Sequence, residues 1–166
     1  MTAAAGVALR WARSAADRTP FSIFRRAPYD GGMILVILRT LWTLPTTAVG
    51  LAIGGICMPT GARWQLVDGV LECHGGGVAW LLEHVTLLPG GATAMTLGDV
   101  VLGRSTSALD LTRRHERVHV RQAHRWGPLF IPAYLLASLV AWLQRRGAYR
   151  GNAFERQAYA DSDPKE

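Results

Sequence analysis

The chain has 166 residues, of which 49% are hydrophobic, and 18 Lys and Arg against 12 Asp and Glu give it a formal net charge of +6. This length suits one domain with a core, or a smaller domain with a membrane anchor, and excludes a second full domain. The charge favours anionic lipid headgroups as partners, whereas the aromatic residues do not interleave with the arginines as a nucleic-acid stacking platform requires. We therefore expect membrane lipid as a partner and disfavour nucleic acid.

Residues 1–32 are rich in Ala and Arg and end in the chain breaker Asp30-Gly31-Gly32. They contain no long apolar run, so they have the composition of a disordered leader and lack an export signal. A structural pattern begins only at Met33. We therefore hypothesise that Met33 is the true start and that residues 1–32 are not part of the protein.

Residues 33–58 form an apolar run interrupted by Arg39 and Pro45. The run is long enough to cross a bilayer once as a kinked helix. Alternatively, two halves of about twelve residues each form a re-entrant or interfacial hairpin. Both alternatives make this segment membrane-associated.

Residues 59–166 are expected to form the folded domain. Its first part has a period of two, with Asp68-Gly69 between two β-prone runs and Gly98-Asp99 between two further short runs. An Asp-Gly pair in that setting is typical of a hairpin turn. Residues 77–88 are ambiguous between helix and strand. We predict a small antiparallel sheet.

Residues 110–126 contain no Gly or Pro and are followed by Gly127-Pro128, which predicts a helix with Asp110 as its N-cap. An apolar helix over residues 129–143 follows; it is short for a membrane span and suited to burial or shallow insertion. A last short helix is predicted over residues 152–160.

The helix over residues 110–126 has two distinct faces at about 100° per residue. The inward face is predicted to carry Leu111, His115, Val118, His119, Gln122 and Trp126. A stripe on another face carries Arg114, Arg117, Arg121 and Arg125. This stripe is either a solvated surface or a surface against anionic headgroups.

His115 and His119 are separated by four residues, so their Cβ atoms lie about 5–6 Å apart on one helix face. Two imidazoles at this spacing can bind one tetrahedral Zn²⁺. Glu116, next to the first histidine, is placed to accept a proton from a zinc-bound water. The alternative is that both histidines are core residues hydrogen-bonded to the sheet.

A catalytic zinc site needs a third protein ligand. His124 points away from the histidine face, and Asp110 is better used as a cap, so we select Glu155 on the last helix. The competing interpretation is local: Asn152 and Glu155 also form an Asn-x-x-Glu capping box, in which Glu155 would only close the start of its own helix.

The HExxH sequence His115-Glu116-Arg117-Val118-His119, followed by Glu155 in an E-x-x-A context, resembles the gluzincin zinc metallopeptidases, in particular their bacterial membrane-bound members. The resemblance covers about residues 110–160. It implies His115, His119 and Glu155 as zinc ligands and Glu116 as general base or acid.

Together these features predict an α+β protein in which a small antiparallel sheet packs on a zincin-like HExxH helix, with one or two apolar membrane-associated helical segments. The expected function is zinc-dependent hydrolysis of a peptide or protein substrate at the cell membrane, with the active site facing the cytoplasm. The alternative is a non-catalytic membrane interaction or scaffold protein with the same fold, with or without structural zinc.

Overall fold

The computed structural model describes residues 32–86, 88 and 90–162. The leader predicted over residues 1–32 therefore lies outside the described residues, except for Gly32. The first helix is α2 (Gly32–Cys57), followed by the 3₁₀ turn η2 (Met58–Thr60). The remaining elements are β1 (Arg63–Val67), β2 (Val70–His74), α3 (Gly76–His84), β3 (Ala94–Leu97), β4 (Val100–Gly103), α4 (Thr106–Trp126), η3 (Gly127–Leu129), α5 (Phe130–Leu143) and α6 (Ala153–Ser162). The α+β class is confirmed.

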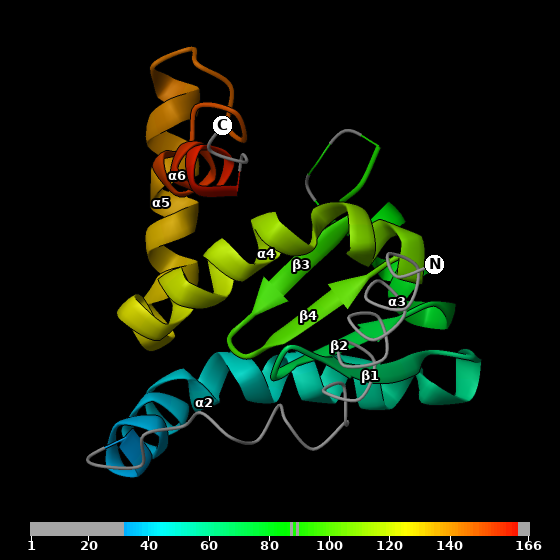
Figure 1. Ribbon diagram of the computed structural model, residues 1–166. Helices are drawn as coiled ribbons and strands as arrows, with labels where there is room; N and C mark the ends of the chain where they lie inside the picture. The colour runs from blue at the N-terminus through cyan, green and yellow to red at the C-terminus, as the bar shows by residue number, and fades with distance from the viewer. Residues whose placement is uncertain (1–31, 87, 89, 163–166) are drawn as a thin grey trace, which may run out of the picture. The chain divides into compact units, whose positions relative to one another are not determined.

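The four strands form one sheet in the order β1-β2-β4-β3 (Figure 1). The predicted hairpin is confirmed, with Asp68 and Gly69 at φ values of 48° and 77° in the turn between β1 and β2. The prediction of a purely antiparallel sheet is wrong, because β2 and β4 pair in parallel. After β2 the ambiguous segment forms α3, and the next strand, β3, lies at the edge of the sheet and runs opposite to β2. The turn after β3 then places β4 between β3 and β2, where β4 runs in the same direction as β2.

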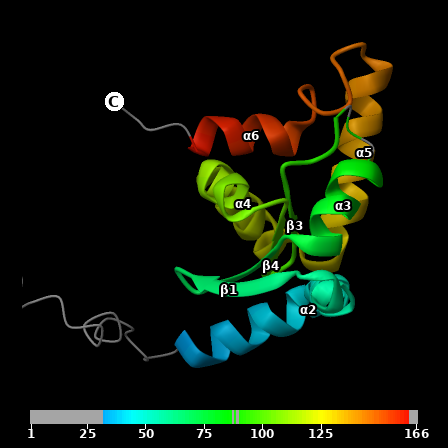
Figure 2. The ribbon, with the colours of Figure 1, turned by 90° about the vertical axis from the view of Figure 1, so that its right-hand side faces the viewer.

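Helices cover both faces of the sheet. Val100 and Leu102 of β4 belong to a core cluster with residues of α2 and α3, whereas Val101 belongs to a second cluster with Leu109 and Val120 of α4. This alternation follows from the period of two in a strand. Figure 2 shows the sheet between α4 on one side and α2 on the other.

The apolar segment forms the single continuous helix α2, which runs through Pro45 instead of dividing into two halves. One narrow side of α2 packs on the sheet. At Gly54 a Cβ atom would lie 2.2 Å from the Trp64 ring, and at Gly50 a Cβ would lie 2.9 Å from Cβ of Val100. Glycine is therefore required at both positions because the sheet approaches the helix backbone closely.

Polar contacts fasten the same side of α2. Thr43 Oγ1 donates to Asp99 Oδ2 at 2.5 Å, and the backbone N–H of Asp99 donates to Thr47 Oγ1 at 3.0 Å. Asp99 also pairs with His124 near the end of α4. The hydrogen bond with His124 lowers the pKa of Asp99 below its usual value, against the effect of burial.

Two helical stretches are long and apolar enough to cross a membrane by length and composition, Leu35–Thr60 with mean hydropathy 1.5 and Thr106–Leu143 with 1.6. Many apolar side chains on α2 and α5 are exposed, for example Ile56 at 77% and Trp142 at 62%. In Figures 1 and 2 α5 stands upright, whereas α2 runs along the lower side of the sheet.

The helix bearing the two histidines begins earlier than predicted. Ser105 is the N-cap of α4, and its Oγ accepts a hydrogen bond from the Ala108 N–H at 3.1 Å. The assignment of Asp110 as N-cap is wrong: it lies inside the helix and pairs with Arg113 at 2.6 Å. The predicted end at Gly127-Pro128 is confirmed.

Candidate metal centre

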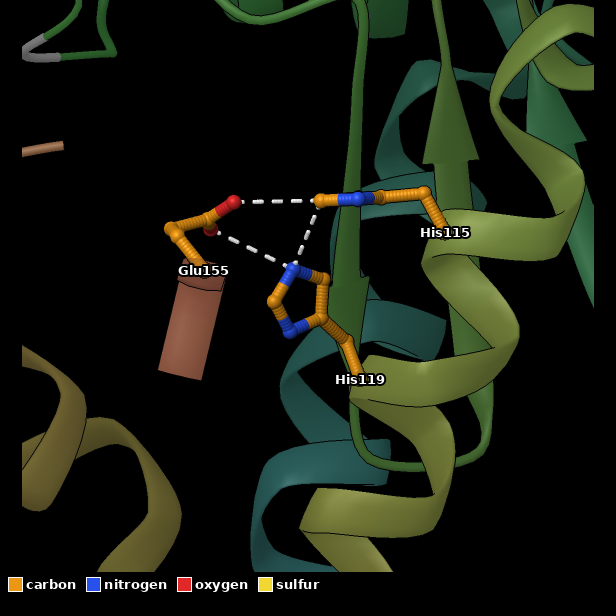
Figure 3. Close-up of side chains that lie close together, drawn as sticks. All are labelled: His115, His119 and Glu155. Carbon is orange, nitrogen blue, oxygen red and sulfur yellow. Dashed lines mark hydrogen bonds and ion pairs between the residues drawn. The ribbon is translucent and has the colours of Figure 1, made fainter. Parts of the chain in front are cut away.

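The structure brings His115, His119 and Glu155 together (Figure 3). The Nε2 atoms of the two histidines lie 3.0 Å apart. Glu155 Oε2 lies 3.1 Å from His115 Nε2, and Glu155 Oε1 lies 3.2 Å from His119 Nε2. Three atoms of the types that bind metal ions thus converge on one point, from α4 on one side and α6 on the other.

Asn152 decides where Glu155 points. Its side chain is buried at the start of α6, where Oδ1 accepts from the Phe154 N–H at 2.8 Å and Nδ2 donates to Tyr134 O at 3.0 Å and Ser138 Oγ at 2.7 Å. Asn152 therefore caps α6 and attaches it to α5. The backbone N–H of Asn152 bonds to Tyr149 O, so the reciprocal bond of a capping box is absent and Glu155 turns towards the histidines.

Gln122 orients the second histidine. Its Nε2 donates to the carbonyl oxygen of Phe154 and to Gln157 Oε1, both at 3.1 Å, so its Oε1 faces His119 Nδ1 at 2.8 Å. Because an amide oxygen only accepts, Nδ1 of His119 carries a proton. With a metal ion bound, this tautomer leaves the Nε2 lone pair free for coordination.

Tyr134 holds the glutamate from the other side. Its hydroxyl donates to Glu155 Oε1 at 2.7 Å. Burial alone would raise the pKa of Glu155, but the hydrogen bonds from His115, His119 and Tyr134 outweigh it and keep that pKa well below its usual value. The same carboxylate, together with burial, raises the pKa of Tyr134. Glu155 is therefore an anion held between α4 and α5.

When no metal ion is bound, the short contacts among His115, His119 and Glu155 can form only if protons lie between their nitrogen and oxygen atoms. Burial disfavours the charged form of His119, yet the hydrogen bond to Glu155 and the nearby charge of Glu116 raise its pKa above the usual value. His115 differs, because its Nδ1 is buried and forms no hydrogen bond with any described residue. Its ring lies against that of Tyr159, with centroids 4.7 Å apart.

Glu116 is buried between α4 and the edge strand β3. Its Oε2 accepts a hydrogen bond from Thr96 Oγ1 at 2.7 Å. Burial raises the pKa of Glu116, an effect opposed mainly by the charge of His119 and by the bond from Thr96. Proton exchange near neutral pH is easier for a carboxyl group whose pKa is raised in this way.

The faces predicted for α4 need two corrections. Leu111 and Trp126 do not face inward, since they are 83% and 41% exposed. Arg117 does not belong to an exposed stripe: with Arg113 it binds the buried Glu72 of β2, whereas Arg114, Arg121 and Arg125 are exposed. Arg117 is withdrawn from the surface because it binds Glu72 of β2, a contact that the helical period of α4 does not reveal.

Three residues of this centre escaped the sequence prediction of its chemistry. The helical period placed Gln122 on the inward face but gave it no role. Its position three residues after His119 could have indicated a contact between the two side chains. Asn152 was identified only as a possible cap of its own helix, which it is, and the sequence carried no signal for its contacts with α5 or for the contact of Tyr134 with Glu155. His124, rejected as a ligand, indeed lies elsewhere and pairs with Asp99.

The chain was compared with protein-family models, curated proteins and solved structures, and none of them matches it. The function must therefore be argued from the residues of the centre themselves.

Proposed function

We propose that this protein is a zinc-dependent hydrolase that cleaves peptide bonds next to a membrane. One observation carries the proposal: the Nε2 atoms of His115 and His119 lie 3.0 Å apart, and the two carboxylate oxygens of Glu155 lie 3.1 and 3.2 Å from them. The HExxH sequence, in which Glu116 directly follows the ligand His115, supports a catalytic role for the metal rather than a purely structural one.

The donor set fits zinc. With ligand distances of about 2.0–2.2 Å, neighbouring ligands of a tetrahedral zinc ion lie about 3.3–3.5 Å apart. The present spacings are slightly shorter, so a small outward movement of the three side chains accommodates the ion. Two imidazoles and one carboxylate leave the fourth position for water or substrate.

A bound zinc ion supplies a Lewis acid and acidifies its water. Within the chain, Glu116 is the group we assign to take the proton from that water and deliver it to the leaving amine. Thr96 holds the Glu116 carboxylate in place by its hydrogen bond. Gln122 and Tyr134 keep His119 and Glu155 oriented, so that the ligands need little rearrangement on binding.

Membrane association is the second part of the proposal. The exposed outer sides of α2 and α5 are apolar, while one side of α2 is covered by the sheet. A helix with one side on a protein and the other apolar suits the interfacial plane of a bilayer. We propose that α2 lies there, with the arginine-rich surfaces and the metal centre on the cytoplasmic side.

The test uses the full chain in detergent. Zinc per chain is measured after dialysis for the wild type and for His115→Ala, His119→Ala, Glu155→Gln and Glu116→Gln, with the exposed Glu83→Gln as control. Removing a ligand should sharply lower zinc content. Glu116→Gln should keep about one zinc per chain and lower casein or peptide-library hydrolysis by about 10²-fold or more.

The outcomes are distinct. No stoichiometric zinc in the wild type after reconstitution would reject the metal centre. Zinc loss in Glu116→Gln with retention in Glu155→Gln would reverse their assigned roles. Tight zinc binding without turnover would favour the alternative, a membrane scaffold with structural zinc.

A further inference from the structure

Two adjoining cavities lie beside the metal centre. The first, of about 410 Å³, lies between α4 and α6, and the second, of about 430 Å³, lies between α5 and the start of α6. They share the lining residues Trp126, Ala153 and Phe154, so they adjoin one another, and we call the two together the groove. Each volume lies in the usual range of small-molecule sites, about 300–1,000 Å³.

The two ends of this groove differ in chemistry. The lining along α5 is mainly apolar, with Leu136, Ala137 and Val140 among its residues. The lining between α4 and α6 contains the amides of Gln122 and Gln157 and the guanidinium groups of Arg121 and Arg125. Neither lining contains an Asp or Glu, so a bound anion would meet no repulsive carboxylate there.

Arg121 and Arg125 lie one helical turn apart on α4, so both can contact one phosphate group. Both are exposed, and the ion pairs found among the described residues involve neither of them. Arg146 and Arg156 also line the cavity beside α5 and add to the positive charge of the groove. A mainly apolar cavity that adjoins a pair of arginines is complementary to an anionic amphiphile.

We propose that this groove binds one anionic phospholipid, with the phosphate at Arg121 and Arg125 and an acyl chain along α5. An acyl chain brings no hydrogen-bonding groups into an apolar cavity. An extended acidic peptide would bring backbone N–H and C=O groups, which need partners that the lining along α5 does not offer. Leu136 and Val140 of the cavity lining are also exposed, so the apolar lining continues onto the outer surface of α5.

The bound lipid would touch residues that hold the metal centre. Gln122 lines the groove and bonds to His119 Nδ1, and Phe154 lines it and immediately precedes Glu155. The groove is thus a point where a membrane component can influence the orientation of two ligands. The inference itself rests on the groove and requires neither zinc nor hydrolysis.

The experiment uses the full chain in a nonionic detergent. Dihexanoyl phosphatidylglycerol is titrated by calorimetry against dihexanoyl phosphatidylcholine, and zinc per chain is measured in parallel. We expect saturable binding of the anionic lipid. The Arg121→Gln/Arg125→Gln double variant should weaken it about tenfold or more, since each cation near a lipid phosphate contributes about 1 kcal/mol.

The matched control is Arg114→Gln/Arg150→Gln, which removes the same charge from exposed positions outside the groove and should leave the affinity unchanged. Ala137→Trp, which fills the α5 cavity, should also weaken binding. Zinc content should stay constant in both arginine double variants, so loss of lipid binding and loss of the metal centre remain distinguishable.

Four results would overturn the proposal. They are equal affinity for the two lipids, an equal loss in the two arginine double variants, equal binding of inorganic phosphate alone, and binding of a hexaglutamate peptide in preference to lipid. The last result would assign the groove to an acidic peptide segment.

Discussion

His115 and Arg117 are two residues apart on α4, yet their surroundings differ in kind. The Glu72 carboxylate receives Arg113 at 3.0 and 3.1 Å, Arg117 at 3.3 Å and Gln65 at 2.8 Å, so opposite charges meet inside the chain. At His115, two imidazole nitrogens and a carboxylate face one another. Paired buried charges fasten α4 to the sheet, whereas converging lone pairs indicate a place for a cation.

The pKa shifts agree with this contrast. Burial would raise the pKa of Glu72, but the hydrogen bonds from Arg113 and Gln65 and the charge of both arginines lower it. We call Glu72, Arg113, Arg117 and Gln65 the Glu72 cluster. Within it, the negative charge of Glu72 is compensated by the two arginines of α4, and Gln65 of β1 adds a hydrogen bond. The histidine cluster needs a proton or a metal ion from outside.

The largest effect, a loss of stability, is expected at the Glu72 cluster. Glu72→Ala leaves Arg113 and Arg117 partly buried without their partner, so the free energy of unfolding should fall by about 3–5 kcal/mol. Denaturant unfolding followed by circular dichroism measures this change. The exposed Glu83→Ala is the control, and a loss below about 1 kcal/mol for Glu72→Ala would show that the cluster does not hold α4 on the sheet.

A smaller effect, on zinc affinity, is expected at Gln122, which does not bind the metal but orients His119. Gln122→Leu removes the acceptor for His119 Nδ1 and should weaken zinc binding about 10–100-fold. Competition with a chelator measures the affinity. Gln157→Leu removes a partner of Gln122 but not of His119 and should change the affinity much less; equal losses would contradict the assigned role of Gln122.

The metal-free protein should respond to pH through His119. Its folded pKa is raised, so its contribution to stability is full below the unfolded pKa of about 6.5 and is lost as the pH rises through the folded value. Thermal unfolding at pH 6 and pH 8 should therefore show lower stability of the metal-free chain at pH 8. Saturating zinc should remove this difference, and a metal-free chain more stable at pH 8 would contradict the assignment.

The smallest change in stability is expected at Asp110, an exposed partner of Arg113 in the Glu72 cluster. Arg113 also pairs with Asp110 at 2.6 Å, but the Asp110 side chain is 58% exposed. An exposed ion pair contributes about 0–1 kcal/mol, so Asp110→Asn should change the free energy of unfolding by no more than that. A change comparable to that of Glu72→Ala would remove the distinction between buried and exposed partners of Arg113.

The sequence alone predicted the features that depend on neighbouring residues. The Asp68-Gly69 turn, the end of α4 at Gly127-Pro128 and the shared face of His115 and His119 follow from local backbone preferences and from the helical period. The same local rules left two positions open for Glu155: beside the two histidines, which we selected, or at the start of its own helix as part of a capping box. Both outcomes use the same four residues, and only the contacts of Asn152 with α5 separate them.

Tertiary structure decided the features in which distant segments compete for one group. The parallel pairing of β2 and β4 joins two strands that α3 and β3 separate in the chain, and the burial of Arg117 depends on Glu72, which lies 45 residues earlier in the chain. Tyr134 reaches Glu155 because α5 and α6 pack together. Such contacts form only when the whole domain collapses, since each segment alone finds water as an adequate partner for its polar groups.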